Sequence, residues 1–148
     1  MNKTQKTAII SIVSTVVAEE SPYAETVLIT AMDRLGISMF EIESEQRVIA
    51  NLANVQGPRF VDNIIQGLSS DDKRKAIEII QYAYNNAGNG NFEETMAYNE
   101  IMAKFNVRGE GYKTLNIRLD DSVRSISRSA ACHLSGIIAN GVAMSLGS

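Results

Sequence analysis

Proline is almost absent from this chain, and its two occurrences stand where helices are expected to begin. Pro22 and Pro58 are the only prolines in 148 residues, and each separates one apolar stretch from the next. Proline fits the first turn of a helix but breaks a helix interior. The apolar residues between these breaks recur at three- and four-residue spacing. This pattern predicts a single, all-α domain.

The spacing of apolar residues predicts six helices in the first two thirds of the chain. Their ranges are residues 4–19, 23–35, 38–52, 58–68, 69–87 and 92–105. The first is apolar nearly all round, which predicts a central, buried position. In the third, Ser38 and Glu41 have the spacing of a capping box, and Val48, Ile49 and Leu52 are expected to face inward.

The fifth helix has the most regular apolar stripe. Its members are Ala76, Ile77, Ile80, Ala83, Tyr84 and Ala87. Residues 112–119 differ from everything before them, because Leu115, Ile117 and Leu119 alternate with polar neighbours as in a strand. A lone strand forms no sheet, so this segment is predicted either to pack on the helices in extended form or to pair with another chain.

A last helix is predicted over about residues 121–144. Its apolar face carries Val123, Ile126, Ala130, Leu134, Ile137 and Gly141. From Ser129 to Ser148 no charged residue occurs, and many residues are small. Small residues allow close helix packing, so this segment is expected to pack within the domain or against a second copy, which would make a homo-oligomer.

Charge and cysteine content exclude several classes of protein. The net charge is −3 and the isoelectric point is about 5.2, which gives no positive field to attract nucleic acid. A single cysteine, Cys132, forms no internal disulfide, so a cytoplasmic location is expected.

No convincing membrane span is present. Lys3 and Lys6 before the uncharged run 7–18 resemble a signal peptide, but polar residues interrupt the run and favour a buried helix.

The sequence also matches itself at an offset of 69 residues. The aligned pairs are Lys6 with Lys75, Ile10 with Ile79, Ala18 with Ala87, Tyr23 with Phe92, Glu25 with Glu94 and Thr26 with Thr95. This predicts two repeated helical hairpins, each with two helices and a short polar turn, that bury their apolar stripes against each other.

On these residues, positions 4–107 resemble the TerB-like family, helical domains associated with tellurite resistance and with stress or phage-defence systems. Family repeats carry a turn of the form Ala-x-x-Asp-Gly-x-Ile and then an early glutamate. Here the turns are residues 18–25 (AEESPYAE) and 87–94 (AGNGNFEE). At the aspartate position stand Glu20 and Asn89. In the family the acidic turn residues bind metal, so the resemblance implies Glu20, Glu25, Asn89 and Glu94 as candidate ligands.

The residues themselves offer two more candidate cation sites, and for each a structural alternative is favoured. Glu19, Glu20 and Glu25 cluster near one turn, and Glu93 and Glu94 near the other. If the hairpins pack antiparallel, the clusters approach each other and form a weak divalent cation site. The favoured alternative is that these glutamates stabilise helix N-termini. A calcium loop from Asn85 would have Ala87 at position three and Met96 at position twelve, which leaves too little charge to dehydrate calcium. A structural Gly/Asn turn is therefore preferred, and no cofactor is expected.

The C-terminal region offers candidates for binding a partner. Arg124 and Arg128 are four residues apart on one helix face, where they would grip a carboxylate or phosphate, or pair with neighbouring aspartates. With Leu115, Ile117 and Leu119 they make the predicted partner-binding set. Cys132 and His133 are adjacent on a helix and so project in different directions, which favours a structural role over a catalytic pair.

These observations predict a helical core at residues 1–107 and a C-terminal extension at 108–148 that packs on the core or on a partner. The expected function is a non-enzymatic binding or scaffold protein in stress response or phage–host conflict. Two alternatives remain at this point. One is a small enzyme with a carboxylate site between the hairpins, and the other is a self-assembling structural subunit.

Overall fold

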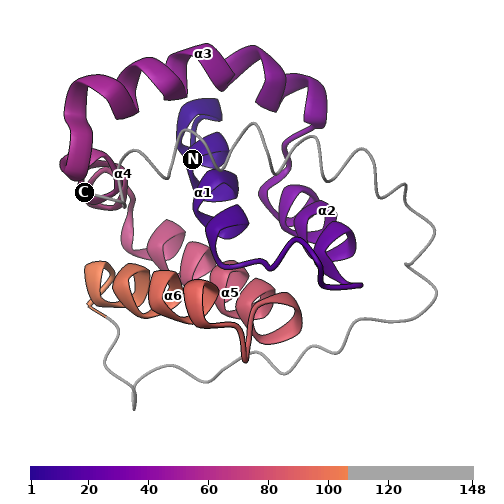
Figure 1. Ribbon diagram of the computed structural model, residues 1–148. Helices are drawn as coiled ribbons and strands as arrows, with labels where there is room; N and C mark the ends of the chain where they lie inside the picture. Colours follow the sequence, from indigo (N-terminus) through magenta and orange to yellow (C-terminus); the bar gives the residue numbers. More distant parts are fainter. Residues whose placement is uncertain (107–148) are drawn as a thin grey trace.

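The computed structural model describes residues 1–106, and this part of the chain is all-α, as the sequence predicts (Figure 1). No strand occurs among the described residues. The elements in chain order are α1 (Lys3–Thr15), α2 (Ala24–Leu35), α3 (Met39–Gln56), the 3-10 helix η1 (Gly57–Arg59), α4 (Phe60–Gln66), α5 (Ser70–Ala87) and α6 (Phe92–Lys104).

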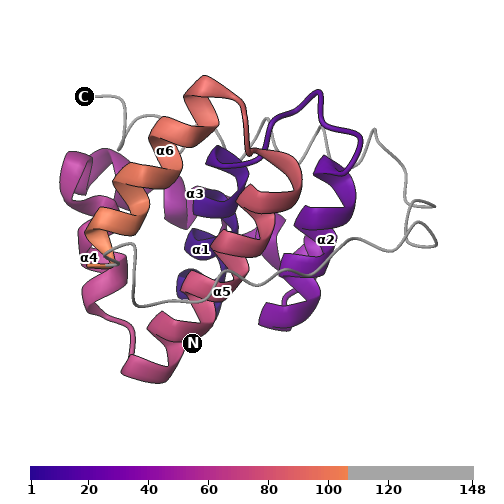
Figure 2. The same cartoon turned by 90° about the horizontal axis from the view of Figure 1, so that it is seen from below.

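The first helix lies at the centre of the molecule. All residues from Thr7 to Ser14 are buried, and α1 contacts each of the other five α-helices (Figures 1 and 2). Its buried hydroxyls donate to carbonyls one turn back, Ser11 to Thr7 at 3.0 Å and Ser14 to Ser11 at 2.6 Å. The hydroxyl groups that interrupt this apolar run therefore have hydrogen-bond partners inside the helix and do not require contact with water. The prediction of a buried first helix is confirmed.

The predicted end of this helix, residue 19, is wrong by four positions. The helix ends at Thr15, and Val16 is its C-cap, with its N–H donating to the Val13 carbonyl at 3.1 Å. Beyond it, the Ala18 N–H donates to the carbonyl of Ala87 at 2.8 Å, a partner in the distant helix α5. An amide committed to that tertiary bond cannot also continue the helix.

Two pairs of consecutive helices lie near the residues that the 69-residue offset aligns, although α1 has 13 residues and α5 has 18. The first pair is α1 with α2, and the second is α5 with α6. The two pairs pack against each other, because α2 contacts α5 and α6 contacts α1 (Figure 2). A single apolar core results, in which Ile9, Ile10, Leu28, Ile80 and Ile101 are fully buried.

Several helix boundaries agree with the sequence signals. Gly36 has φ +65° at the end of α2, a conformation that favours glycine. Ser38 and Glu41 form the predicted capping box at the start of α3. The Ser69 side chain accepts from the Asp72 N–H at 3.1 Å and caps α5, whose predicted stripe is buried along its whole length. These helices start and end at the capping residues and the glycine that the sequence indicates.

The prediction that Val48 faces inward is wrong. Its exposed fraction is 42%, whereas its neighbour Ile49 is 4% exposed, and Leu52 is half-buried. Adjacent helical residues project about 100° apart, and α3 lies at the edge of the molecule with one narrow buried face. Ile42, Ile49 and Ala53 make that face. Val48 lies outside it.

The predicted extended segment at 112–119 and the predicted helix at 121–144 lie outside the described residues. Within residues 1–106, no helix combines the length and the apolar character that crossing a membrane requires.

Candidate functional site

The loop between α1 and α2 combines a buried start with an exposed acidic tip. Val17 and Ala18 are buried, while Glu19 and Glu20 are exposed. The Ser21 N–H donates to the Ala18 carbonyl at 3.0 Å, and the Ser21 hydroxyl accepts from the Tyr23 N–H at 3.2 Å. These bonds turn the chain tightly, so the two carboxylates are carried on a defined loop.

The turn between α5 and α6 is shorter and is built from asparagine and glycine. Both the Gly88 and Asn89 N–H groups donate to the Tyr84 carbonyl, at 2.9 and 2.8 Å. Gly90 has φ +93°, which favours glycine. The Asn91 N–H then donates to the Gly88 carbonyl at 3.1 Å. Helix α5 runs through Ala87 and α6 begins at Phe92, so four residues connect them, as expected for a structural turn.

The two turns touch through their backbones, and we call this contact the turn junction (residues 16–18 with 87–88). Besides the bond from Ala18 to Ala87, Gly88 lies directly against Val16. A Cβ atom at Gly88 would lie 1.8 Å from the Val16 carbonyl oxygen, well inside van der Waals contact. Glycine is therefore required here by space, and the two turns are held in fixed relation.

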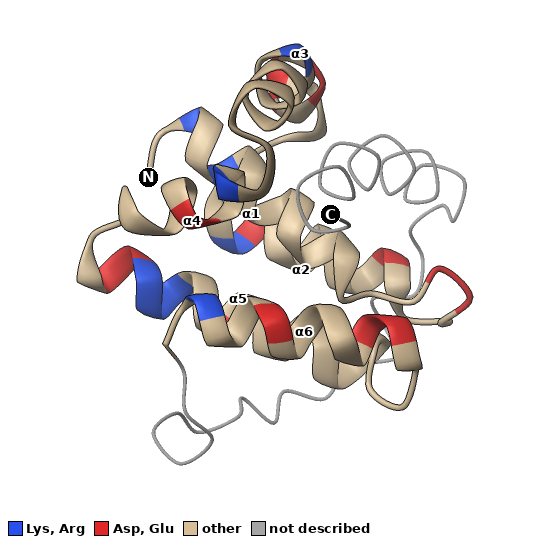
Figure 3. Cartoon of the chain, turned by 60° about the vertical axis from the view of Figure 1, so that its left-hand side comes forward, with Lys and Arg blue, Asp and Glu red and all other residues tan. Residues whose placement is uncertain are grey.

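A hollow of about 550 Å³ lies beside the turn junction, and we call it the larger hollow. It is lined by Ser14, Thr15, Val17, Glu19, Glu20, Asn91, Phe92, Glu93 and Glu94. Glu19 and Glu20 of one turn and Glu93 and Glu94 of the other thus face one space, at the acidic end of the molecule (Figure 3). Phe92 adds an apolar ring that is 78% exposed. Neither lysine nor arginine is among these lining residues.

A smaller hollow of about 230 Å³ opens near the same junction. It is lined by Ala18, Glu20, Ser21, Pro22, Asn85, Asn86, Ala87, Gly88, Asn89 and Asn91. Glu20 and Asn91 line both hollows. The Asn85 side-chain nitrogen is buried and has no hydrogen-bond partner within the described residues.

Aromatic packing fixes α6, which carries Phe92, Glu93 and Glu94, against α5. The rings of Tyr84 and Tyr98 stack with centroids 4.0 Å apart, and the Tyr84 hydroxyl lies 2.7 Å from the Thr95 hydroxyl. Burial raises the pKa of Tyr98; a hydrogen bond with Gln81 lowers it, and the neighbouring Tyr84 raises it again. At its far end α6 is tied to α4 by Lys104 and Asp62, 3.1 Å apart.

The structure distributes the four candidate metal ligands over different places. Glu20 and Glu94 line the larger hollow, and Glu20 and Asn89 line the smaller one. Glu25 is buried in α2, with an exposed fraction of 6%, and lines neither hollow. Among the described residues, no three His, Cys, Asp or Glu side chains come together in a group that could hold a metal ion.

The predicted partner-binding residues lie outside the described part of the chain. They are Leu115, Ile117, Leu119, Arg124 and Arg128, and the same holds for Cys132 and His133. Sequence reasoning did not identify Phe92 as a surface residue or Gly88 as a contact. A signal for Gly88 existed, because it stands one residue after Ala87, the repeat partner of Ala18.

Comparisons with known proteins assign no role to this site, so its function has to be inferred from its own residues. No protein-family model, no curated protein and no solved structure matches this chain.

Proposed function

We propose that this chain is a non-enzymatic binding or scaffold protein, and that the larger hollow receives a positively charged segment of a partner protein. The observation that carries the proposal is the gathering of Glu19, Glu20, Glu93 and Glu94 around one space. Carboxylates held on one surface attract lysine and arginine side chains and exclude anionic partners.

The apolar component of the hollow supports a protein partner rather than a bare cation. Phe92 is largely exposed at the rim, and Met96, one turn further along α6, is 58% exposed. Exposed aromatic and methionine side chains on a domain surface are typical of protein contacts. A partner segment that presents both a cation and an apolar side chain would satisfy both parts of the surface.

The turn junction supports this role physically. Because Gly88 and Val16 are in backbone contact and Ala18 bonds to Ala87, the two acidic turns do not have to be brought together when a partner binds. A surface that is already ordered loses less conformational entropy on binding. The resemblance of residues 4–107 to the TerB-like family supports a role in stress response or in phage–host conflict, and the genes beside this one would distinguish these settings.

The test is a titration of the isotope-labelled chain with a synthetic peptide of alternating lysine and leucine, followed by NMR. We expect shifts concentrated at residues 17–20 and 91–96, weakened by added salt. The double variant Glu20→Gln with Glu93→Gln removes two exposed charges and should weaken binding about tenfold. Glu43→Gln removes one exposed charge on α3, away from the hollow. It is the control for general charge effects and should leave the affinity unchanged, whereas Glu20→Gln alone, which also removes one charge, should weaken binding.

A peptide in which glutamate replaces lysine should not bind. Shifts scattered over the whole surface, or equal weakening by Glu43→Gln, would mean that the attraction is general and that the larger hollow is not a binding site.

A further inference from the structure

The turn between α5 and α6 contains an asparagine followed by glycine, the pair in which an asparagine most readily loses its side-chain amide. Asparagine is a thermolabile residue, because the backbone nitrogen of the next residue can attack its side-chain carbonyl carbon. A glycine in that next position has no side chain to shield the nitrogen. Among residues 1–106, Asn89 is the only asparagine that precedes a glycine. It is therefore the asparagine most open to this reaction in the described part of the chain.

The structure leaves the peptide group between Asn89 and Gly90 without the hydrogen bonds that would block the reaction. Both residues are exposed. The Asn89 N–H donates to Tyr84, and the Asn91 N–H donates to Gly88. The Gly90 N–H between them has no hydrogen-bond partner within residues 1–106, and the Asn89 side chain has none there either. The attacking nitrogen and the amide that it attacks are thus both accessible.

The space around Gly90 is also open. Gly90 has φ +93°, and a Cβ atom at this position would meet nothing within 4 Å. Two positions earlier the opposite holds, because a Cβ atom at Gly88 would overlap the Val16 carbonyl oxygen. The reactive peptide group therefore lies just outside the tightly packed turn junction, where no neighbouring atom crowds this side of it.

The nearby asparagines differ from Asn89, and we call them the reference asparagines (Asn85, Asn86 and Asn91). Asn85 and Asn86 lie inside α5, where the N–H group of the following residue donates along the helix. Asn91 precedes Phe92, whose side chain shields the backbone nitrogen. They are expected to keep their amides under conditions in which Asn89 loses its own.

We propose that Asn89 is a site of spontaneous modification, at which a neutral amide becomes a carboxylate. The Gly90 nitrogen gives up its proton and bonds to the side-chain carbonyl carbon of Asn89. The bond from that carbon to the amide nitrogen breaks, and the nitrogen leaves as ammonia with the proton. Water then adds to either carbonyl of the resulting cyclic imide and opens it to aspartate or to isoaspartate. No oxidant or reductant takes part.

The product changes the charge beside the turn junction. Asn89 and Glu20 both line the smaller hollow, and Glu20 is the only charged residue of that lining. A second carboxylate there repels the first. Isoaspartate also adds one carbon to the backbone between the N–H groups of Asn89 and Asn91, whose hydrogen bonds fix the turn. The modification thus alters the smaller hollow, and it stands independently of the proposed function.

The test follows the Asn89 side-chain amide in the full-length, isotope-labelled chain, kept for several weeks in mildly alkaline buffer at body temperature. NMR should show loss of the Asn89 amide signal, whereas the signals of the reference asparagines remain. Peptide mapping should find both aspartate and isoaspartate at position 89, because only the cyclic imide gives isoaspartate. Mapping also separates this site from a second pair, Asn140 and Gly141, which lies outside the described residues.

Two controls separate the folded turn from general hydrolysis. Asn89→Gln is the matched variant, because glutamine has to close a larger ring and should keep its amide at this exposed position. A synthetic peptide of residues 85–94 gives the rate without the fold. At a stability of about 5 kcal/mol only one chain in several thousand is unfolded, so a rate in the full chain within about tenfold of the peptide's comes from the folded chain.

Four results would overturn the proposal. They are an Asn89 amide in the full chain that outlasts that of the peptide by more than this factor, equal loss at the reference asparagines, a product at position 89 that contains aspartate alone, and loss of the side-chain amide in Asn89→Gln at the wild-type rate.

Discussion

The turn junction and the exposed side of α3 that carries Phe40, Val48 and Val55 use apolar and polar residues in opposite ways. At the junction, backbone meets backbone, Gly88 leaves no space for a side chain, and the carboxylates point outward around a hollow. On α3 the backbone contacts are local, and large apolar side chains lie on the surface. The two turns are held by contacts within residues 1–106, whereas Phe40, Val48 and Val55 stay exposed there.

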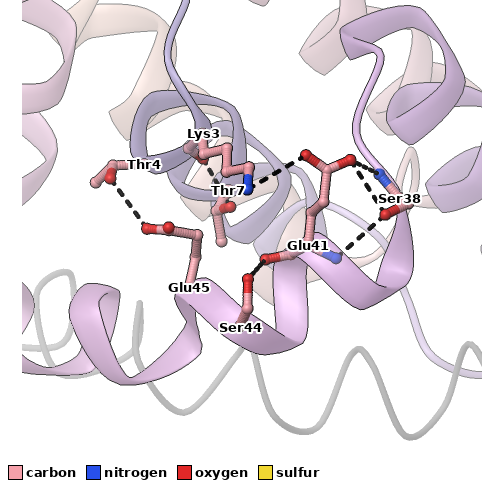
Figure 4. Close-up of polar contacts among 7 residues, drawn as sticks. All are labelled: Lys3, Thr4, Thr7, Ser38, Glu41, Ser44 and Glu45. Carbon is pink, nitrogen blue, oxygen red and sulfur yellow. Dashed lines mark hydrogen bonds and ion pairs between the residues drawn. The ribbon is translucent and has the colours of Figure 1, made fainter.

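This difference indicates which regions of the described structure determine its global stability. Buried side chains of α1, α2, α4, α5 and α6 make up most of the apolar core. Helix α3 contributes one narrow face to that core, and polar contacts of its Glu41 and Glu45 with Lys3 and Thr4 hold it on α1 (Figure 4). Changes in the core and at the junction should therefore affect global stability, whereas changes on the exposed sides of α3 should not.

The largest effect is expected from Ile80→Asp in α5. Ile80 is fully buried, and an unpaired buried carboxylate costs several kcal/mol out of the roughly 5–15 kcal/mol that a domain has. The variant should be unfolded or nearly so by circular dichroism. Ala50→Asp, on an exposed side of α3 away from its apolar residues, should change the free energy of unfolding by about 1 kcal/mol or less, mostly through the lower helix propensity of aspartate. Equal effects of the two would remove the contrast between the regions.

The next effect concerns Gly88→Ala. The added Cβ would overlap the Val16 carbonyl oxygen, a backbone atom that cannot rotate away, so we expect a loss of about 3 kcal/mol. Gly67→Ala is the matched control, because its Cβ would make ordinary contacts at 3.5 Å or longer. Thermal unfolding of both variants measures the difference. A Gly88→Ala melting temperature equal to that of Gly67→Ala would show that the two turns are not in contact.

A smaller effect is expected at high pH from Tyr98, next to the junction. Burial raises its pKa above the usual value, so the folded state keeps the proton that the unfolded state has lost. The stability it contributes is complete below pH ~10 and is lost as the pH rises through the folded-state value. Urea unfolding at rising alkaline pH should therefore show a smaller stability loss for Tyr98→Phe than for the wild-type chain. An identical pH dependence would contradict the burial of this ring.

The smallest effect is expected from divalent cations. The carboxylates of the larger hollow face one space but form no ligand group among the described residues, so calcium, magnesium and zinc should bind weakly at most. Calorimetric titration measures this directly. A dissociation constant tighter than about 1 µM, or about −8 kcal/mol, that is lost in Glu20→Gln would make the hollow a metal site.

Sequence patterns predicted α5 well and α3 poorly, for a physical reason. In α5 the charged residues are confined to positions 71–78, and all residues from Ile79 to Tyr84 are buried, so no apolar residue of the predicted stripe is left on an exposed side. In α3 apolar residues lie on both sides, and adjacent Val48 and Ile49 cannot both face a narrow contact. Periodicity alone does not tell which of the two is buried.

The candidate site was predictable in part. The 69-residue offset indicated that the acidic turns could approach each other, and the structure puts Glu19 and Glu20 around one hollow with Glu93 and Glu94. The contact of Gly88 with Val16 and the early end of α1 were not predictable from local signals. Both depend on a bond between residues far apart in the chain, Ala18 and Ala87.

Hydrogen exchange at the Ala18 amide tests the turn junction most directly. This amide lies in a loop but donates to the Ala87 carbonyl, so we predict that it exchanges as slowly as amides in the middle of α1, through global unfolding. The Ser21 amide, in the same loop but bonded locally, is predicted to exchange faster. An Ala18 amide that exchanges as fast as that of Ser21 would contradict the account.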